Sequence, residues 1–149
     1  MKKQNTKYAM IGRLELADFP VFGLEDVVVK VDTGAYTSSI HVATCEERST
    51  SSGKVLAVVF LDESHPQFTG EERMFTSYRQ KKVKSSTGQE QLRYFVNGSI
   101  RLGDLEYTTE FSLTRRNGMR HPILLGRKLL NRRFVVDPSR KNITRKSSK

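Results

Sequence analysis

The 149-residue chain contains one cysteine, Cys45, no tryptophan and four prolines. A single cysteine excludes an internal disulfide framework and is typical of a reducing compartment, so we expect a cytoplasmic location. No apolar run approaches the ~20 residues that a membrane-spanning helix needs, so we expect no membrane partner. Residues 1–8 are basic and polar, and no apolar region of the length found in signal peptides follows them. We therefore expect a disordered lead-in without a secretory signal.

Several common catalytic and ligand-binding motifs are also missing. The chain has no G-x-x-x-x-G-K-[ST] phosphate loop, no H-E-x-x-H zinc pair and no G-x-S-x-G nucleophile turn. His41 and Cys45 are four residues apart, which on an extended strand separates them by ~13 Å, too far to share one metal ion. We therefore expect no metal site and no cofactor.

Positive charge is plentiful but concentrated at one end of the chain. Residues 1–110 contain 14 Lys/Arg and 15 Asp/Glu, whereas residues 111–149 contain 12 Lys/Arg and one acid, Asp137. Such a segment attracts polyanions: nucleic acid, an acidic membrane surface or an acidic peptide. The same composition is equally typical of a solubilising surface with a frayed basic tail, which we place at 139–149.

The hydrophobic pattern predicts an all-β fold in one domain at 9–138. Short β-branched or apolar runs recur between turn signals, with almost no helical period, which indicates a barrel or a sandwich. The predicted strands lie at 9–12, 26–31, 35–42, 54–61, 91–96, 99–102, 106–113, 123–126 and 134–136, with one short helix at 127–131.

Turn signals separate these strands. Ser85–Gly88 predicts a hairpin turn, Asn97-Gly98 is the strongest short hairpin signal in the chain, and Gly103-Asp104 predicts another turn. The polar, Ser/Thr-rich stretch at 46–53 is predicted to be a loop.

The pattern around Asp32 is the strongest candidate site. A valine-rich run at 27–31 leads into D-T-G-A at 32–35, and an extended segment follows. Far downstream, I-L-L-G-R at 123–127 ends a second apolar strand on a glycine before the predicted helix. D-T-G alone is more often an ordinary turn, so the setting carries the prediction.

At these residues the sequence resembles the retropepsin-like aspartic proteases, which share D-T-G-A after an apolar strand and a late apolar-apolar-G-R before a short helix. It is similar in particular to a bacterial and archaeal family often labelled ATP-dependent zinc protease and associated with ribosomal-protein glutamate ligases. No motif here matches the ATP or the zinc of that label. The motifs that carry the resemblance run in order over about residues 10–138: I-G-R at 11–13, K-V-D-T-G-A at 30–35, T-S at 37–38, G-Q-E-Q-L-R at 88–93, S-L-T-R-R-N-G-M at 112–119, P-I-L-L-G-R at 122–127 and V-D-P at 136–138.

The resemblance implies a closed retropepsin-like acid-protease barrel with one short C-terminal helix, and an aspartic-type endopeptidase activity. Aspartic proteolysis uses two carboxylates that share one proton. This chain supplies one D-T-G and is too short for two lobes, so we expect a homodimer in which the Asp32 residues meet on a two-fold axis. Thr33 would then hydrogen-bond across the axis, and Gly34 would let the backbone approach the substrate.

The resemblance also implies an acidic substrate, such as an oligoglutamate tail on a ribosomal protein. It assigns substrate binding to Ala35, Arg116 and Met119. The forked guanidinium donors of Arg116 suit glutamate carboxylates. It assigns structural or interface roles to Leu125, Gly126 and Arg127. We expect the substrate-covering flap within 69–84.

A second hypothesis is a non-catalytic β-barrel that docks RNA or ribosomes through its basic C-terminal quarter and tail. Binding through phosphates weakens steeply with added salt because counterions are released. Only the protease hypothesis requires Asp32, so a substitution there distinguishes the two.

Overall fold

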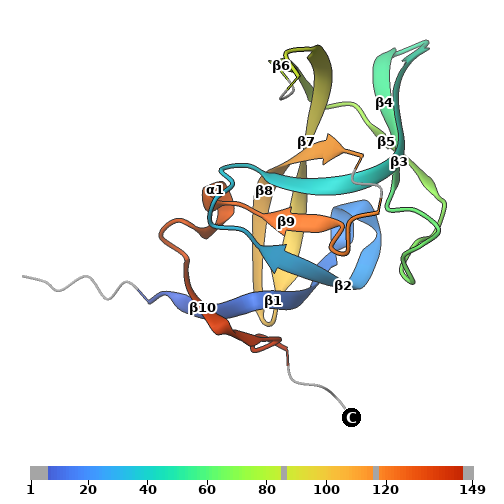
Figure 1. Cartoon of the computed structure of the whole chain (residues 1–149). Coiled ribbons are helices and arrows are strands. Elements are labelled where there is room, and N and C mark those ends of the chain that lie inside the picture. The colour runs from blue at the N-terminus through green and yellow to red at the C-terminus, as the bar shows by residue number, and fades with distance from the viewer. Residues whose placement is uncertain (1–6, 85–86, 116–117, 146–149) are drawn as a thin grey trace, which may run out of the picture.

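The computed structural model describes residues 7–84, 87–115 and 118–145. Ten strands, one 3-10 turn and one short helix are found in this part of the chain (Figure 1), which confirms the all-β prediction and the short helix near the C-terminus. The elements are β1 (Ala9–Phe19), η1 (Pro20–Phe22), β2 (Leu24–Val31), β3 (Ser38–Thr50), β4 (Gly53–Phe60), β5 (Glu72–Phe75), β6 (Arg79–Lys84), β7 (Glu90–Leu102), β8 (Leu105–Thr114), β9 (Ile123–Leu125), α1 (Arg127–Leu130) and β10 (Phe134–Lys141).

Six of these strands close into a barrel. The pairing order is β1, β2, β9, β3, β8 and β7, and β7 returns to β1 through the pair Asp18–Arg101. The barrel is mixed, because β2–β9 and β3–β8 are parallel whereas the other pairs are antiparallel. The predicted closed barrel is therefore confirmed.

The strand β9 positions the candidate site. It lies between β2 and β3, so the chain that leaves β2 must cross the end of β9 before it enters β3. The valine run of β2 alternates as a half-buried strand should: Val27 and Val29 are buried in the core and Val28 is exposed. Ile123 and Leu125 of β9 are fully buried. The D-T-G-A turn therefore begins beside a strand that is anchored in the core.

Two hairpins extend from the barrel on the same side (Figure 1). One consists of β3 and β4, with β5 added at the edge of β4. The other consists of β6 and β7, which pair as far as Lys84 and Glu90, so the hairpin predicted at 85–88 is confirmed. Ser85 and Ser86 lie outside the described residues. The segment expected to hold the flap, 69–84, is divided between the two hairpins.

The hairpin turn predicted at Asn97-Gly98 is wrong. Strand β7 runs through both residues, and Gly98 pairs with Thr109 of β8. A Cβ on Gly98 would lie 2.4 Å from Cζ of Phe22. The glycine therefore allows close packing of an aromatic ring on the sheet, rather than a turn. The turn predicted at Gly103-Asp104 is confirmed, since Leu102 pairs with Leu105 across it.

The loop predicted at 46–53 is mostly strand. β3 continues to Thr50 and pairs with β4, which leaves a tight turn between Thr50 and Gly53. Its polar residues lie on a solvent-exposed ribbon and make charged contacts there. Arg48, for example, bonds to Glu46 and to Glu72 on β5 at 2.6 Å.

The fraying expected at 139–149 is absent from residues 139–145. β10 extends to Lys141, and the backbone N–H groups of Ile143 and Thr144 donate to the carboxylate of Glu15. Arg145 pairs with Asp18 at 2.9 Å and also with Asp26. Buried and acidic groups on β1 and β2 therefore hold the segment 142–145, which we call the C-terminal latch.

No helix in the described residues has the length and hydropathy needed to cross a membrane.

Candidate active site

The carboxyl group of Asp32 is presented at the end of β2 by a tight turn. The Asp32 N–H donates to the carbonyl of Leu125 at 2.9 Å, which extends the parallel pairing of β2 and β9 by one residue. The N–H of Ala35 donates to the Asp32 carbonyl at 3.2 Å and closes the turn. The N–H of Gly34 donates to Oδ1 of Asp32 at 3.0 Å.

This arrangement fixes one carboxylate oxygen and leaves the other available. Asp32 is half-buried, and its Oδ2 has no hydrogen-bond partner among the described residues. A Cβ on Gly34 would lie 3.3 Å from Oδ1, so a larger residue would crowd the carboxylate. An ionised carboxylate with one oxygen held and one open can accept a proton from a bound water molecule.

The first residues of α1 hold the turn by hydrogen bonds. The N–H of Arg127 donates to the carbonyl of Ala35, and the N–H of Lys128 donates to that of Tyr36, each at 2.8 Å. The Arg127 guanidinium donates to the Thr33 carbonyl at 3.0 Å, and its Cζ lies 5.8 Å from the centroid of the Tyr36 ring. Arg127 therefore holds the turn through two backbone carbonyl groups, those of Thr33 and Ala35.

Gly126 lies against the segment that follows the turn. A Cβ on Gly126 would lie 2.6 Å from the Tyr36 carbonyl oxygen, so only glycine fits without displacement. The Gly126 N–H donates to the hydroxyl of fully buried Ser38 at 3.0 Å. Sequence reasoning missed Ser38. The only signal for it was the T-S pair at 37–38, noted as part of a motif but given no role.

The structure brings together most of the residues predicted from sequence. Asp32, Thr33, Gly34 and Ala35 form the turn, while Leu125, Gly126 and Arg127 support it. Thr33 and Gly34 are exposed at the tip. Met119 is 49% exposed and is not among the residues that bond to the turn. Arg116 lies outside the described residues.

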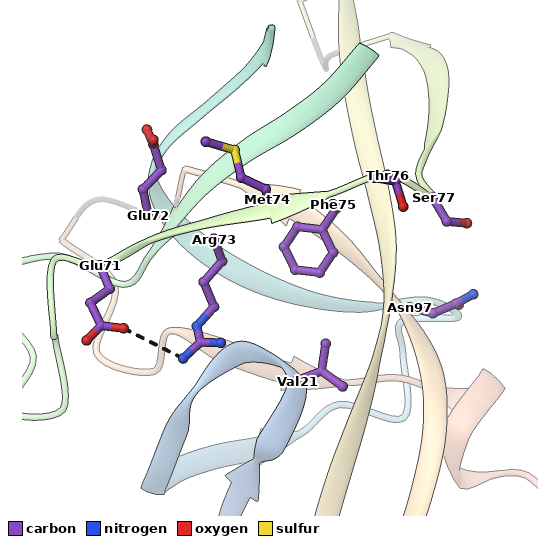
Figure 2. A pocket seen from close by; sticks show the side chains of 9 residues that line it. All are labelled: Val21, Glu71, Glu72, Arg73, Met74, Phe75, Thr76, Ser77 and Asn97. Carbon is purple, nitrogen blue, oxygen red and sulfur yellow. Dashed lines mark ion pairs between the residues drawn. The ribbon is translucent and has the colours of Figure 1, made fainter. Parts of the chain in front are cut away.

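One cavity in the described part of the chain is formed by residues other than those of this turn. It has a volume of about 620 Å³ and is bordered by β5, by Val21 of η1 and by Asn97 of β7 (Figure 2). Its charged side chains partly neutralise each other, since Arg73 lies 3.7 Å from Glu71. None of the site residues predicted from sequence lines it, so cavity size does not identify the site.

A second polar cluster surrounds fully buried His41. Its Nε2 lies 2.6 Å from Oδ2 of Asp62. The hydroxyl and N–H of Ser64 donate to the other oxygen of Asp62, and these bonds, with a smaller contribution from His41, lower the pKa of Asp62 to about 2. The carboxylate lies between serine and histidine, so this is not the order of a nucleophile, base and acid.

No group of three or more His, Cys, Asp or Glu side chains suited to a metal ion occurs in the part of the chain that the structure describes. Burial raises the pKa of the Cys45 thiol to about 11, partly offset by Arg115, so this cysteine is a poor nucleophile.

Comparisons with known proteins show a family match. Residues 10–147 match the family described as RimB-like, retropepsin-like aspartic endopeptidase RimB. Two proteins named probable alpha-L-glutamate ligase, from Shewanella pealeana and Shewanella halifaxensis, are each 30% identical over 134 residues, which is 87% of this chain. The chain spans 28% of the length of each.

A solved structure shares the fold. It is a Legionella pneumophila protein with unknown function, 25% identical, with a TM-score of 0.66. The match covers 93% of this chain and 100% of that one.

Proposed function

Because the chain belongs to the RimB-like family of retropepsin-like aspartic endopeptidases, we propose that it hydrolyses peptide bonds as a homodimer with a shared pair of Asp32 carboxylates. The observation that carries the proposal is the D-T-G-A turn. It holds one oxygen of Asp32 through Gly34 and leaves the other open, on a loop whose tip is exposed.

The dimer follows from the chemistry of that turn. A single carboxylate can act as a base toward water, but an acid is also needed to protonate the carbonyl oxygen of the substrate. The chain has only one D-T-G, so the acid must come from a second copy. Thr33 and Gly34 are exposed and hence accessible to the same loop of a partner.

In this mechanism the two carboxylates share one proton, because two like charges so close together do not both ionise. The ionised Asp32 takes a proton from a water molecule, whose oxygen bonds to the scissile carbonyl carbon. The protonated Asp32 of the partner subunit gives its proton to the carbonyl oxygen. The proton that Asp32 took from water then passes to the amide nitrogen as the C–N bond breaks. A hydroxyl of the diol returns its proton to the partner's Asp32, which yields a carboxylic acid, an amine and the starting pair of carboxyl groups.

Exposed positive charge favours an acidic peptide, and we propose an oligoglutamate tail of a ribosomal protein as the substrate. The β6–β7 hairpin carries three exposed lysines on one strand, Lys81, Lys82 and Lys84. Arg116 and Met119, predicted from the family motif to bind substrate, follow β8 in the sequence. The relatives named probable alpha-L-glutamate ligase support the same choice, because that name denotes an enzyme that joins glutamate.

The RNA-binding alternative has less support than the protease. Its basic tail would have to be free, whereas Arg145 is paired with Asp18 and Asp26. Nucleic-acid binding through the remaining basic residues stays a second role to be tested by its salt dependence.

The test is cleavage of a glutamate-tailed peptide by the wild-type chain and by Asp32→Asn, with Asp104→Asn, an exposed turn residue, as the matched control. Light scattering gives the oligomeric state. In mixtures of wild type and Asp32→Asn we expect activity to fall with the square of the wild-type fraction, because a mixed dimer lacks one carboxylate. Full activity of Asp32→Asn, or an active species that is strictly monomeric, would refute the proposal.

A further inference from the structure

The sheet next to the Asp32 turn contains two buried hydroxyl groups without partners. Ser112 of β8 is 6% exposed, and Thr114, two residues on, is half-buried. The hydroxyl oxygens of both are buried and lack a hydrogen-bond partner among the described residues. Buried hydroxyls are nearly always paired in folded proteins, because an unpaired one loses its hydration without compensation. Two on one face of one strand indicate a ligand that completes them.

A cavity of about 420 Å³ lies against these hydroxyls. We call it the hydroxyl–arginine cavity, because all of its lining residues except Phe95 carry a hydroxyl or a guanidinium group: Thr37, Ser39, Ser112, Thr114, Arg93 and Arg115. A second cavity of about 320 Å³ adjoins it and shares Arg93, Thr114 and Arg115. All the hydroxyls and guanidinium groups of this lining are hydrogen-bond donors.

The positive charge of the cavity is not neutralised by the described part of the chain. Neither Arg93 nor Arg115 has an ion-pair partner among the described residues. The nearest carboxylate along β8, Glu110, is already held by Arg79 at 2.9 Å and by Lys128 at 3.2 Å. Donors without acceptors and cations without counter-charges together favour an anion, and a planar carboxylate matches the forked geometry of arginine.

The cavity adjoins the candidate active site. Ser39 pairs with Ser112 on one side and with Leu124 of β9 on the other. The next residue of β9, Leu125, accepts the hydrogen bond from Asp32. A peptide in extended conformation advances ~3.4 Å per residue, so a residue a few positions from the cleaved bond reaches the cavity.

We propose that the hydroxyl–arginine cavity is a substrate subsite that binds a carboxylate of the peptide, away from the bond that is cleaved. This assignment rests on the proposed protease function. The carboxylate is either an Asp or Glu side chain or the free end of the peptide. Arg93 and Arg115 supply the charge, and the hydroxyls of Ser112 and Thr114 complete the hydrogen bonds.

The test measures binding apart from catalysis. Peptides are titrated calorimetrically into the Asp32→Asn chain, alone and combined with Arg93→Gln, Ser112→Ala or Thr114→Val. Matched controls are Arg101→Gln, at the far end of β7, and Thr108→Val, an exposed threonine on β8. Three peptides are compared: an acidic peptide, the same peptide with Gln for each Glu, and the acidic peptide with an amidated C-terminus.

We expect Arg93→Gln to weaken binding of the acidic peptide about tenfold or more, and each hydroxyl variant to weaken it several-fold. Binding of the peptide that lacks the recognised carboxylate should not differ between parent and variant, and the two control variants should bind all three peptides as their parent does. Thr114→Val should melt no lower than its parent, because the hydroxyl removed has no protein partner. Weaker binding of the Gln peptide assigns a side-chain carboxylate, and weaker binding of the amidated peptide assigns the terminal one.

Two outcomes would overturn the proposal: variants that bind the acidic peptide as tightly as their parent, or variants that weaken binding of the acidic, Gln and amidated peptides equally. Catalysis is a separate readout. A wild-type chain that cleaves no peptide but shows the expected binding pattern refutes the protease function and retains the carboxylate site. Normal cleavage by Arg93→Gln and Thr114→Val does the reverse.

Discussion

Glu15 and Asp32 are carboxylates on adjacent strands that the molecule treats in opposite ways. Glu15 is fully buried and accepts four hydrogen bonds, at 2.7 to 3.2 Å, from Gly12 in its own strand and from the C-terminal latch. Asp32 is half-buried and accepts one, from the backbone two residues on.

The difference teaches what each group is free to do. A buried carboxylate is tolerated only when donors surround it, and Glu15 has no oxygen left for another partner. Asp32 retains an open oxygen at an accessible position. Saturation of one carboxylate therefore serves stability, and incomplete saturation of the other leaves an oxygen available for the proposed chemistry.

The largest effect that we predict separates these two roles directly. Asp32→Asn should lower kcat/KM for an acidic peptide by about 10²–10⁴-fold, because the amide neither takes a proton from water nor gives one to the carbonyl. The free energy of unfolding, measured by urea denaturation, should stay within about 0.5 kcal/mol of wild type, since the amide oxygen still accepts from Gly34. A large loss of stability in Asp32→Asn would show that this carboxylate, too, is structural.

Glu15→Gln should give the converse result. The amide keeps the size of the side chain but places N–H groups against N–H donors, so unfolding should cost about 2–3 kcal/mol less. For a chain of this length, that corresponds to a melting temperature roughly 4–12 °C lower. Activity per folded molecule should be retained.

Deletion of residues 142–149 provides the matched control for Glu15. It removes the latch donors, so it should destabilise by a similar amount. The double variant should lose much less than the sum, because both changes break the same contact. Additive losses would contradict the role assigned to the latch.

Arg127→Ala should have a smaller effect, mainly on catalysis. The guanidinium that donates to the Thr33 carbonyl would be lost, so the turn would hold Asp32 less firmly. We expect kcat/KM to fall about tenfold, with about 1 kcal/mol of stability lost. Arg132→Ala, a nearby exposed arginine, is the control. Equal effects of the two substitutions would remove the positioning role.

The smallest effect concerns Asp62, whose carboxylate is held mainly by Ser64 and also by His41. Its pKa is about 2 in the folded chain, below the usual 3.8, so it stabilises the fold above about pH 4. This contribution is lost as the pH falls from about 4 to about 2. Because the side chain is 27% exposed, solvent screening limits the effect to about 1 kcal/mol or less. Asp62→Asn should flatten the pH dependence of unfolding in this window, and Asp104→Asn should not.

Much of the site followed from local sequence. A β-branched run before D-T-G-A, and I-L-L-G-R before a short helix, identified both halves of the turn and its support, and the family match bears out the resemblance. Strand periodicity also placed the barrel strands β2, β8 and β9. These features depend on neighbouring residues, which a sequence displays directly.

What escaped prediction depends on distant contacts. Asn97-Gly98 has the form of a turn, but the position of Phe22 decides that its glycine lies within a strand. The latch sequence N-I-T-R has no strong structural signal, and its contacts with Glu15, Asp18 and Asp26 explain why it is ordered. Ser112 and Thr114 are 73 or more residues from Thr37 and Ser39 in the sequence, and the register of β3 and β8 alone brings the two pairs together.

The insertion of β9 between β2 and β3 also affects how the protein is made. Arg127 is 94 residues beyond the Thr33 carbonyl that it binds, and ribosomes add about 5–20 residues per second. Roughly 5–20 s therefore separate synthesis of the aspartate from synthesis of the residues that position it. Contacts of such long range also slow folding itself. The nascent chain thus carries Asp32 before the contacts that position it can form, and any fragment that ends before Leu125 lacks the strand that those contacts need.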